Sequence, residues 1–307
     1  MPRYFHALTV TCAVGATLLS PVANADTGKL LLTGGVSSID GAAGGGLTPW
    51  AVIGTYATDE EIGASAFATH VGTRSYGLNI VGAALGVKDR FEFSVARQDF
   101  DTQGTGTALG LPGLHLKQTI LGAKAKVYGD AILDSDTLMP QIAVGLEYKT
   151  LASSRLDSTL DMLGAKRHGV DAYVSATKLL LGQSVLLNAT LRATQANQNG
   201  LLGYGATLGG RENNYSVQPE LSAAYLLNKN VVVGAEYRFM RNKLQSAGNA
   251  AGLGNGLQAS NWKDIFVAWA PSKNFSLTLA YVDLGVIVPA VVQKKQTGFY
   301  ISAQFAL

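Results

Sequence analysis

From residue 28 onward, large apolar residues alternate with small or polar residues along most of the chain. In the stretch 141–149, for example, Ile142, Val144, Leu146 and Tyr148 are separated by small or charged residues. Successive side chains of a β-strand point to opposite faces, so this period of two predicts strands with one apolar and one polar face. About fourteen such segments follow one another, near residues 28–36, 49–58, 61–70, 74–87, 90–100, 114–128, 139–151, 169–181, 184–195, 215–227, 231–240, 262–270, 274–287 and 296–307.

The length of these segments points to a membrane. Many run for about ten residues, whereas a strand of a globular protein has about five or six. A tilted strand needs roughly 9 to 11 residues to cross a bilayer. After residue 25 the sequence has no run of roughly 18 apolar residues, which a membrane-spanning helix would need.

Short and long connections alternate between the segments. Tight turns take every second place, and longer loops lie between them: the turns are 88–90, 182–183, 228–230 and 271–273, and the loops are 101–113, 152–168, 196–214 and 241–261. Aromatic residues of the apolar face gather near both ends of the segments. Both features are typical of bacterial outer-membrane barrels. The sequence therefore predicts an all-β protein, a transmembrane antiparallel β-barrel of about 14 strands, with 12 as the alternative, short periplasmic turns and long extracellular loops.

The first 25 residues have the features of a secretory signal peptide. Arg3 precedes a mostly apolar stretch at 7–19, and Ala23-Asn24-Ala25 matches a cleavage site. Cleavage would leave residues 26–307 as the barrel and would remove Cys12, the one cysteine of the chain. We therefore expect an exported protein of the outer membrane that holds its fold without disulfides.

Composition agrees with a membrane barrel. Charged residues make up 15% of the chain, below the roughly 25% of a soluble domain, and there are 36 glycines. The formal net charge of +3 gives no basis for a nucleic-acid partner. We expect outer-membrane lipid and a small-molecule solute as partners instead.

Eleven charged residues fall on the polar face of the segments and are candidates for the lumen lining: Glu92, Lys124, Lys126, Glu147, Lys149, Asp171, Arg192, Glu220, Glu236, Arg238 and Asp264. Hairpin pairing across the turn 228–230 places Glu220 opposite Arg238. Two interpretations remain open. These residues solvate the lumen and lock neighbouring strands, or they form a constriction that selects solutes.

The segment 34–50 is too rich in glycine to be a good strand, and it lacks the Gly-Lys-Ser/Thr ending of a phosphate loop. One interpretation is a flexible outer loop. The other is a plug that folds into the lumen, with Asp40, Gly44, Gly45, Gly46 and Trp50 as its candidate residues, because glycine permits a close approach of the backbone.

The apolar segment 284–292 also has two interpretations. It extends a strand past the bilayer edge, where Pro289 needs no ladder hydrogen bond, or it forms an apolar entrance for a hydrophobic solute. Catalysis has little support, because His70, His115 and His168 are scattered and lie at strand ends or loops. We predict no catalytic residue, cofactor or metal ligand.

Several ordered motifs extend the argument to a family: 44–51 (GGGLTPWA), 95–101 (VARQDFD), 129–131 (GDA), 140–145 (PQIAVG), 191–198 (LRATQANQ), 234–238 (GAEYR) and 262–264 (WKD). On these motifs the chain resembles, over nearly all of residues 28–305, a Gram-negative family of exported proteins of unknown function regarded as outer-membrane β-barrels. The resemblance implies the barrel fold and brings no catalytic or binding residues with it.

The function we expect is a porin-like channel or transporter for small neutral or amphipathic solutes. The alternative is a structural or adhesive barrel that binds partners through the loops 152–168, 196–214 and 241–261. A third hypothesis, an enzyme acting on outer-membrane lipid, needs one of the three histidines beside a serine and an acid at one rim.

Overall fold

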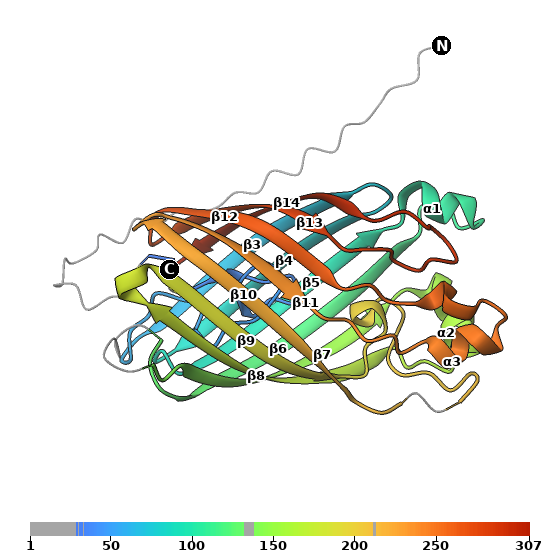
Figure 1. Cartoon of the computed structure of the whole chain (residues 1–307), viewed down its shortest axis with the longest axis horizontal. Helices are drawn as coiled ribbons and strands as arrows, with labels where there is room; N and C mark the ends of the chain where they lie inside the picture. Colours follow the sequence, from blue (N-terminus) through green and yellow to red (C-terminus); the bar gives the residue numbers. More distant parts are fainter. Residues whose placement is uncertain (1–28, 30, 33, 132–137, 211–212) are drawn as a thin grey trace, which may run out of the picture.

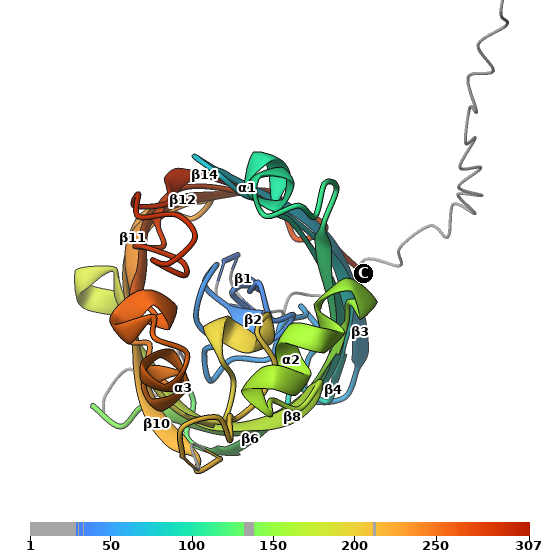
Figure 2. The same ribbon diagram turned by 90° about the vertical axis from the view of Figure 1, so that its right-hand side faces the viewer.

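The computed structural model describes residues 29, 31–32, 34–131, 138–210 and 213–307. The expected signal peptide, residues 1–25, lies outside the described residues. Twelve antiparallel strands form a closed barrel, in which each strand pairs with its neighbours in sequence and β14 pairs with β3 (Figures 1 and 2). The wall consists of β3 (Ile62–Thr73), β4 (Gly77–Val87), β5 (Phe91–Asp101), β6 (His115–Tyr128), β7 (Gln141–Ala152), β8 (His168–Leu180), β9 (Val185–Thr194), β10 (Ser216–Asn228), β11 (Val231–Arg238), β12 (Trp262–Ser272), β13 (Phe275–Asp283) and β14 (Thr297–Ala306).

The predicted all-β barrel is confirmed, with the alternative count of 12 strands. The main count of 14 was wrong, because residues 34–36 and 49–58, from two of the predicted segments, do not join the wall. Residues 36–55 are buried at every position instead of on alternate positions, so both faces of this chain are covered. A period of two in the sequence indicates extended backbone but does not indicate which strand it pairs with.

Those residues belong to a stretch that lies inside the barrel (Figure 2). We call residues 34–57 the inner segment. It contains a two-stranded sheet in which β1 (Val36–Ser37) pairs with β2 (Ala43–Gly44). The expected extension of a strand over 284–292 was also wrong, since β13 ends at Asp283.

The outer surface of the wall is apolar. Residues that point outward, such as Val81 at 56% exposure and Leu279 at 50%, leave large aliphatic side chains uncovered. Aromatic rings of the outer face pair between adjacent strands near both ends, as in Phe275–Phe305 and Tyr281–Phe299, with centroids 5.1 and 5.6 Å apart. This is the surface that a barrel presents to lipid. None of the described helices is long and apolar enough to cross a membrane.

The two ends of the barrel differ. One end carries short turns, and the other carries the longer loops with helices α1 (Gln103–Ala108), α2 (Asp157–Leu163) and α3 (Gln245–Ala250), seen at the right of Figure 1. The loop after β9 turns inward, and its residues 196–201 with the 3₁₀ turn η3 (Gln198–Gly200) are buried. The lumen is thus occupied from both directions.

Candidate functional site

The inner segment makes two tight turns inside the lumen. In the first, the Ser38 N–H donates to Ala42 O at 3.0 Å, and Gly41 takes a left-handed backbone with φ +94°. In the second, the Gly45 N–H donates to Thr48 O at 2.9 Å. A Cβ added to Gly44 would overlap the carbonyl oxygen of Thr48, so the glycine is required by this close backbone packing.

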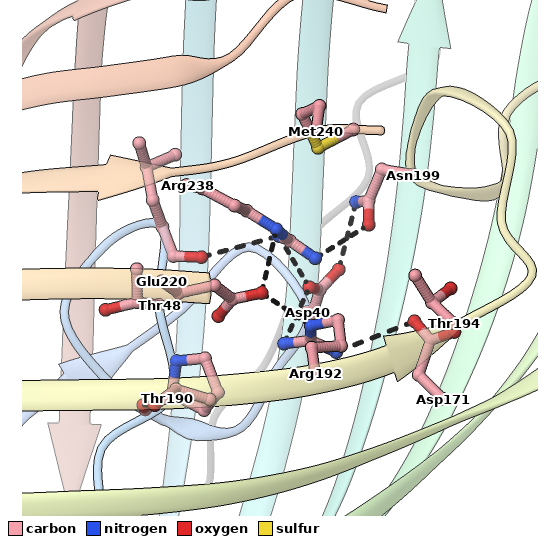
Figure 3. Close-up of polar contacts among 12 residues, drawn as sticks. Asp40, Thr48, Asp171, Thr190, Arg192, Thr194, Asn199, Glu220, Arg238 and Met240 are labelled. Carbon is pink, nitrogen blue, oxygen red and sulfur yellow. Dashed lines mark hydrogen bonds and ion pairs between the residues drawn. The ribbon is translucent and has the colours of Figure 1, made fainter. Parts of the chain in front are cut away.

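Asp40 lies at the tip of the first turn and contacts cations from three wall strands. Figure 3 shows two of them, Arg192 and Arg238. Its carboxylate oxygens are 2.9 Å from Arg238 Nη1, 3.2 Å from Lys149 Nζ and 3.7 Å from Arg192 Nη2. All four side chains are at most 1% exposed. Charge pairs at such distances are strong where water is excluded.

The environment of Asp40 fixes its ionisation. Burial alone would raise the pKa of this carboxyl group, but Lys149, Arg238 and Arg192 outweigh that effect and hold the pKa well below its usual range. Asp40 is therefore a carboxylate throughout the physiological pH range.

Wall residues complete the cluster around Asp40. Arg192 bridges Glu147 and Glu220, with both nitrogen–oxygen distances at 2.6 Å. Arg238 Nε lies 3.1 Å from Glu220, which confirms the predicted pairing across the 228–230 turn. The central cluster, as we call it, consists of the carboxylates Asp40, Glu147, Asp171 and Glu220 and the cations Lys149, Arg192 and Arg238.

Asn199, which the sequence did not suggest, joins this cluster from the inward loop. Its side-chain oxygen accepts from Arg238 at 3.0 Å and from Lys149 at 3.3 Å, and its amide donates to Asp40 at 3.1 Å. Gln198, Asn199 and Gly200 all have positive φ. The Asn-Gly pair is the sequence signal for such a turn, but nothing in the sequence indicates that the turn points into the lumen.

A second contact holds the other face of the inner segment. Glu92 accepts the backbone N–H groups of Ala43 at 2.9 Å and Gly54 at 2.8 Å. Lys124 lies 3.1 Å from Glu92 and donates to the carbonyl oxygens of Ala43 at 3.0 Å and Trp50 at 3.3 Å. The Glu92–Lys124 ion pair of the wall therefore binds the backbone of the inner segment rather than its side chains.

A third contact is made by Glu236. Its carboxylate accepts from the Leu47 N–H at 2.7 Å and from the Thr48 hydroxyl at 2.6 Å. Ser222 lies beside it, with its hydroxyl 2.5 Å from that of Thr48 and 3.0 Å from Trp50 Nε1. Thr48 and Ser222 were missed from sequence, since isolated hydroxyl residues on a polar strand face give no signal.

The candidate lumen residues lie on the inner face of the wall, and all but Lys126 are buried. Lys126 sits near the short-turn end, where its Nζ is 2.5 Å from Asp89. Asp264 pairs with Glu236 across β11 and β12 and lies beside Gly46 of the inner segment. Gly45 faces the Glu236 carboxylate so closely that a Cβ there would overlap it.

Between the inner segment and the long-loop end lies an apolar cavity of about 40 Å³. Its wall side includes Val71, Tyr76, Phe100, Trp262 and Val282. Its cover consists of Ile39 and Leu47 of the inner segment together with Leu201, Leu284 and Ile287 of the loops. Part of the 284–292 segment thus lines the lumen.

The histidines are at or near the outer surface. His70 Nδ1 is 2.7 Å from Asn79, and the His115 Nδ1 is 2.6 Å from Asp99. The Ser153 hydroxyl donates to the backbone oxygen of His115 at 3.0 Å rather than to its ring, and His115 Nε2 faces Asp101 at 3.8 Å. The His168 ring lies near that of Tyr148, with the centroids 6.2 Å apart and the planes tilted by 43°. The described contacts do not form the relay of serine, histidine and acid that lipid hydrolysis would need.

These features define a class of protein, a β-barrel with an apolar exterior and a charged lumen that is filled by its own N-terminal chain. The chain belongs to the family of proteins of unknown function (DUF3034), whose model matches residues 33–304. No curated protein shows significant similarity to it.

Solved structures with a similar shape include outer-membrane barrels. A KdgM porin has a TM-score of 0.47 at 8% identity, covering 78% of this chain and 98% of the porin. The COG4313 outer membrane channel from Pseudomonas putida F1 has a TM-score of 0.47 at 11% identity, covering 80% and 94%. The outer membrane phospholipase A from Escherichia coli has 0.40 at 10%, covering 79% and 89%. Likeness at this level includes both channels and an enzyme, and it carries no argument about function.

Proposed function

We propose that the protein is a channel of the outer membrane for small neutral or amphipathic solutes, exported by its signal peptide and held closed by the inner segment. The observation that carries this proposal is the way the inner segment is held. Besides the apolar packing of Ile39, Leu47 and Trp50, polar and ionic groups of the wall bind the segment at three places, whereas the contacts of a permanent core are mainly apolar. When the inner segment leaves, these polar groups of the wall can form hydrogen bonds with water and solute in its place.

The lining supports a solute without strong charge. Once the inner segment leaves, the wall residues of the central cluster are three carboxylates, Glu147, Asp171 and Glu220, facing three cations, Lys149, Arg192 and Arg238. A lumen of balanced charge neither concentrates nor repels ions of one sign. The adhesive alternative has less support, because residues 196–201 of one expected binding loop are buried against the lumen.

Asp40→Asn tests the proposal at its main contact. The substitution removes the charge of the inner segment and leaves the wall cluster balanced, so the wall should keep its structure. We expect proteoliposomes with this variant to swell several-fold faster in neutral sugars than those with the wild type. Asp59→Asn is the matched control, because Asp59 is exposed just outside the lumen.

The double variant Asp40→Asn/Glu236→Gln weakens two of the three contacts and should swell faster still. A double variant that inserts as a folded barrel and stays impermeable to sugars and ions would contradict the proposal.

A further inference from the structure

A cleft of about 360 Å³ opens at the long-loop end, above the turn between β3 and β4. Arg74 and Ser75 of that turn form one side, Gln103 and Thr105 of α1 form another, and Val291 and Val292 supply an apolar edge. Its volume falls within the range of about 300 to 1,000 Å³ that is usual for small-molecule sites. One cation, a few hydrogen-bonding groups and an apolar edge are thus gathered at the mouth of the barrel.

Arg74 is the one charged residue in this cleft. Its side chain is exposed at the cleft and makes no ion pair or hydrogen bond with any described residue. Asp101, which pairs with Gly77 across β4 and β5, accepts from the Gln103 N–H at 2.8 Å and faces His115. An exposed guanidinium that lines a cleft without a carboxylate suits an oxyanion, which it can bind through two parallel hydrogen bonds.

The apolar cavity of the lumen lies on the other side of the same turn. Thr73, Tyr76 and Gly77, which flank Arg74 and Ser75, line that cavity. The loop that supplies Val291 and Val292 to the cleft supplies Ile287 to the cavity. Arg74 and the apolar cavity therefore lie on opposite sides of the turn between β3 and β4.

We propose that this cleft and cavity together bind an amphipathic solute with a carboxylate at one end, whose carboxylate meets Arg74 and whose apolar chain enters the cavity. This deepens the proposed channel function by naming the class of solute at its outer mouth, and it rests on that function only for what happens after binding. The cavity of about 40 Å³ admits the end of a short alkyl chain. Leu201, Leu284 and Ile287 must move aside before a longer chain fits, and each of them lies in a loop outside the wall strands.

Equilibrium binding to the full chain in lipid nanodiscs tests the inference, with calorimetry as the readout and empty nanodiscs as the blank. Hexanoate is the probe, hexanamide lacks the charge, and acetate lacks the chain. We expect hexanoate to bind at least tenfold more tightly than either. Arg74→Gln should abolish the advantage over hexanamide, and Arg74→Lys should retain part of it. Ile287→Ser should weaken hexanoate and hexanamide alike.

Arg241→Gln is the matched control, since Arg241 is exposed on another loop, and it should leave all three affinities unchanged. Hexanoate binding that is undetectable, no tighter than acetate binding, or indifferent to Arg74→Gln would overturn the inference. Because binding is measured without transport, the two proposals fail separately. Loss of hexanoate binding in a protein that still opens to sugars refutes this site alone, and binding in a protein that never conducts refutes the channel alone.

Discussion

At the scale of single residues, the charge count of the central cluster decides what each substitution does. Four carboxylates face three cations, and Asp40 is the only member that the inner segment contributes. Removing Asp40 leaves three charges of each sign in the wall. Removing Arg192 instead leaves four buried carboxylates with two cations, and an uncompensated buried charge typically costs about 3 to 5 kcal/mol. Asp40 is thus the position where the segment can be released with least damage to the barrel.

The pH dependence of stability tests the charge state of Asp40. Its pKa is held below the value of about 3.9 that an unfolded aspartate has. A lowered pKa contributes stability that is complete above the unfolded pKa and is lost as the pH falls through the folded one. We expect the stability difference between wild type and Asp40→Asn, on the order of 3 kcal/mol, to be constant from about pH 8 to pH 5 and to shrink below about pH 4.

Guanidinium unfolding followed by tryptophan fluorescence at several pH values provides this difference. A gap that already closes between pH 7 and pH 5 would mean that Asp40 is not held as a carboxylate by its three cations.

At the scale of elements, the inner segment depends on glycine where its backbone folds tightly. A methyl group on Gly44 would meet the Thr48 oxygen and would lie 2.8 Å from Pro49 Cα, and neither backbone atom can move away alone. We expect Gly44→Ala to loosen the segment, whereas Gly182→Ala, in a short turn with open space around it, should have no effect.

Cysteine labelling measures this loosening. The expected mature chain has no cysteine, so Ser38→Cys, which is 1% exposed in the wild type, reports only on the inner segment. Maleimide labelling of that cysteine should be at least tenfold faster with Gly44→Ala than without it. Equal rates would indicate that the turn does not hold the segment in the lumen.

The same elements explain what the sequence could predict. Wall strands were placed to within a few residues, because alternation reports directly on a wall with lipid on one side and polar groups on the other. The count was wrong where residues 49–55 are enclosed on both sides, since local alternation carries no information about pairing partners. Inner-face charges such as Glu147 and Arg192 could be assigned from strand parity. Asn199 could not, because a loop has no parity and its path depends on contacts across the whole lumen.

At the scale of the whole molecule, wall and inner segment are separate in their bonding. The twelve strands satisfy one another's backbone groups in a closed ring, as a barrel in lipid must. The inner segment adds side-chain and ion-pair contacts to several of those strands but does not interrupt the ring. We therefore infer a complete wall around a removable segment.

A reversible tether tests this claim most directly. The Thr48 and Ser222 hydroxyl oxygens are 2.5 Å apart, close to the roughly 2.05 Å of a disulfide, so cysteines at both positions can join the segment to β10. In the triple variant Asp40→Asn/Thr48→Cys/Ser222→Cys, we predict discrete single-channel conductance in planar bilayers after reduction. That conductance should disappear on oxidation and return with fresh reductant, while Asp40→Asn/Thr48→Cys stays open in both conditions. Conductance that is absent after reduction, or the same in the oxidised and reduced triple variant, would contradict a channel closed by its inner segment.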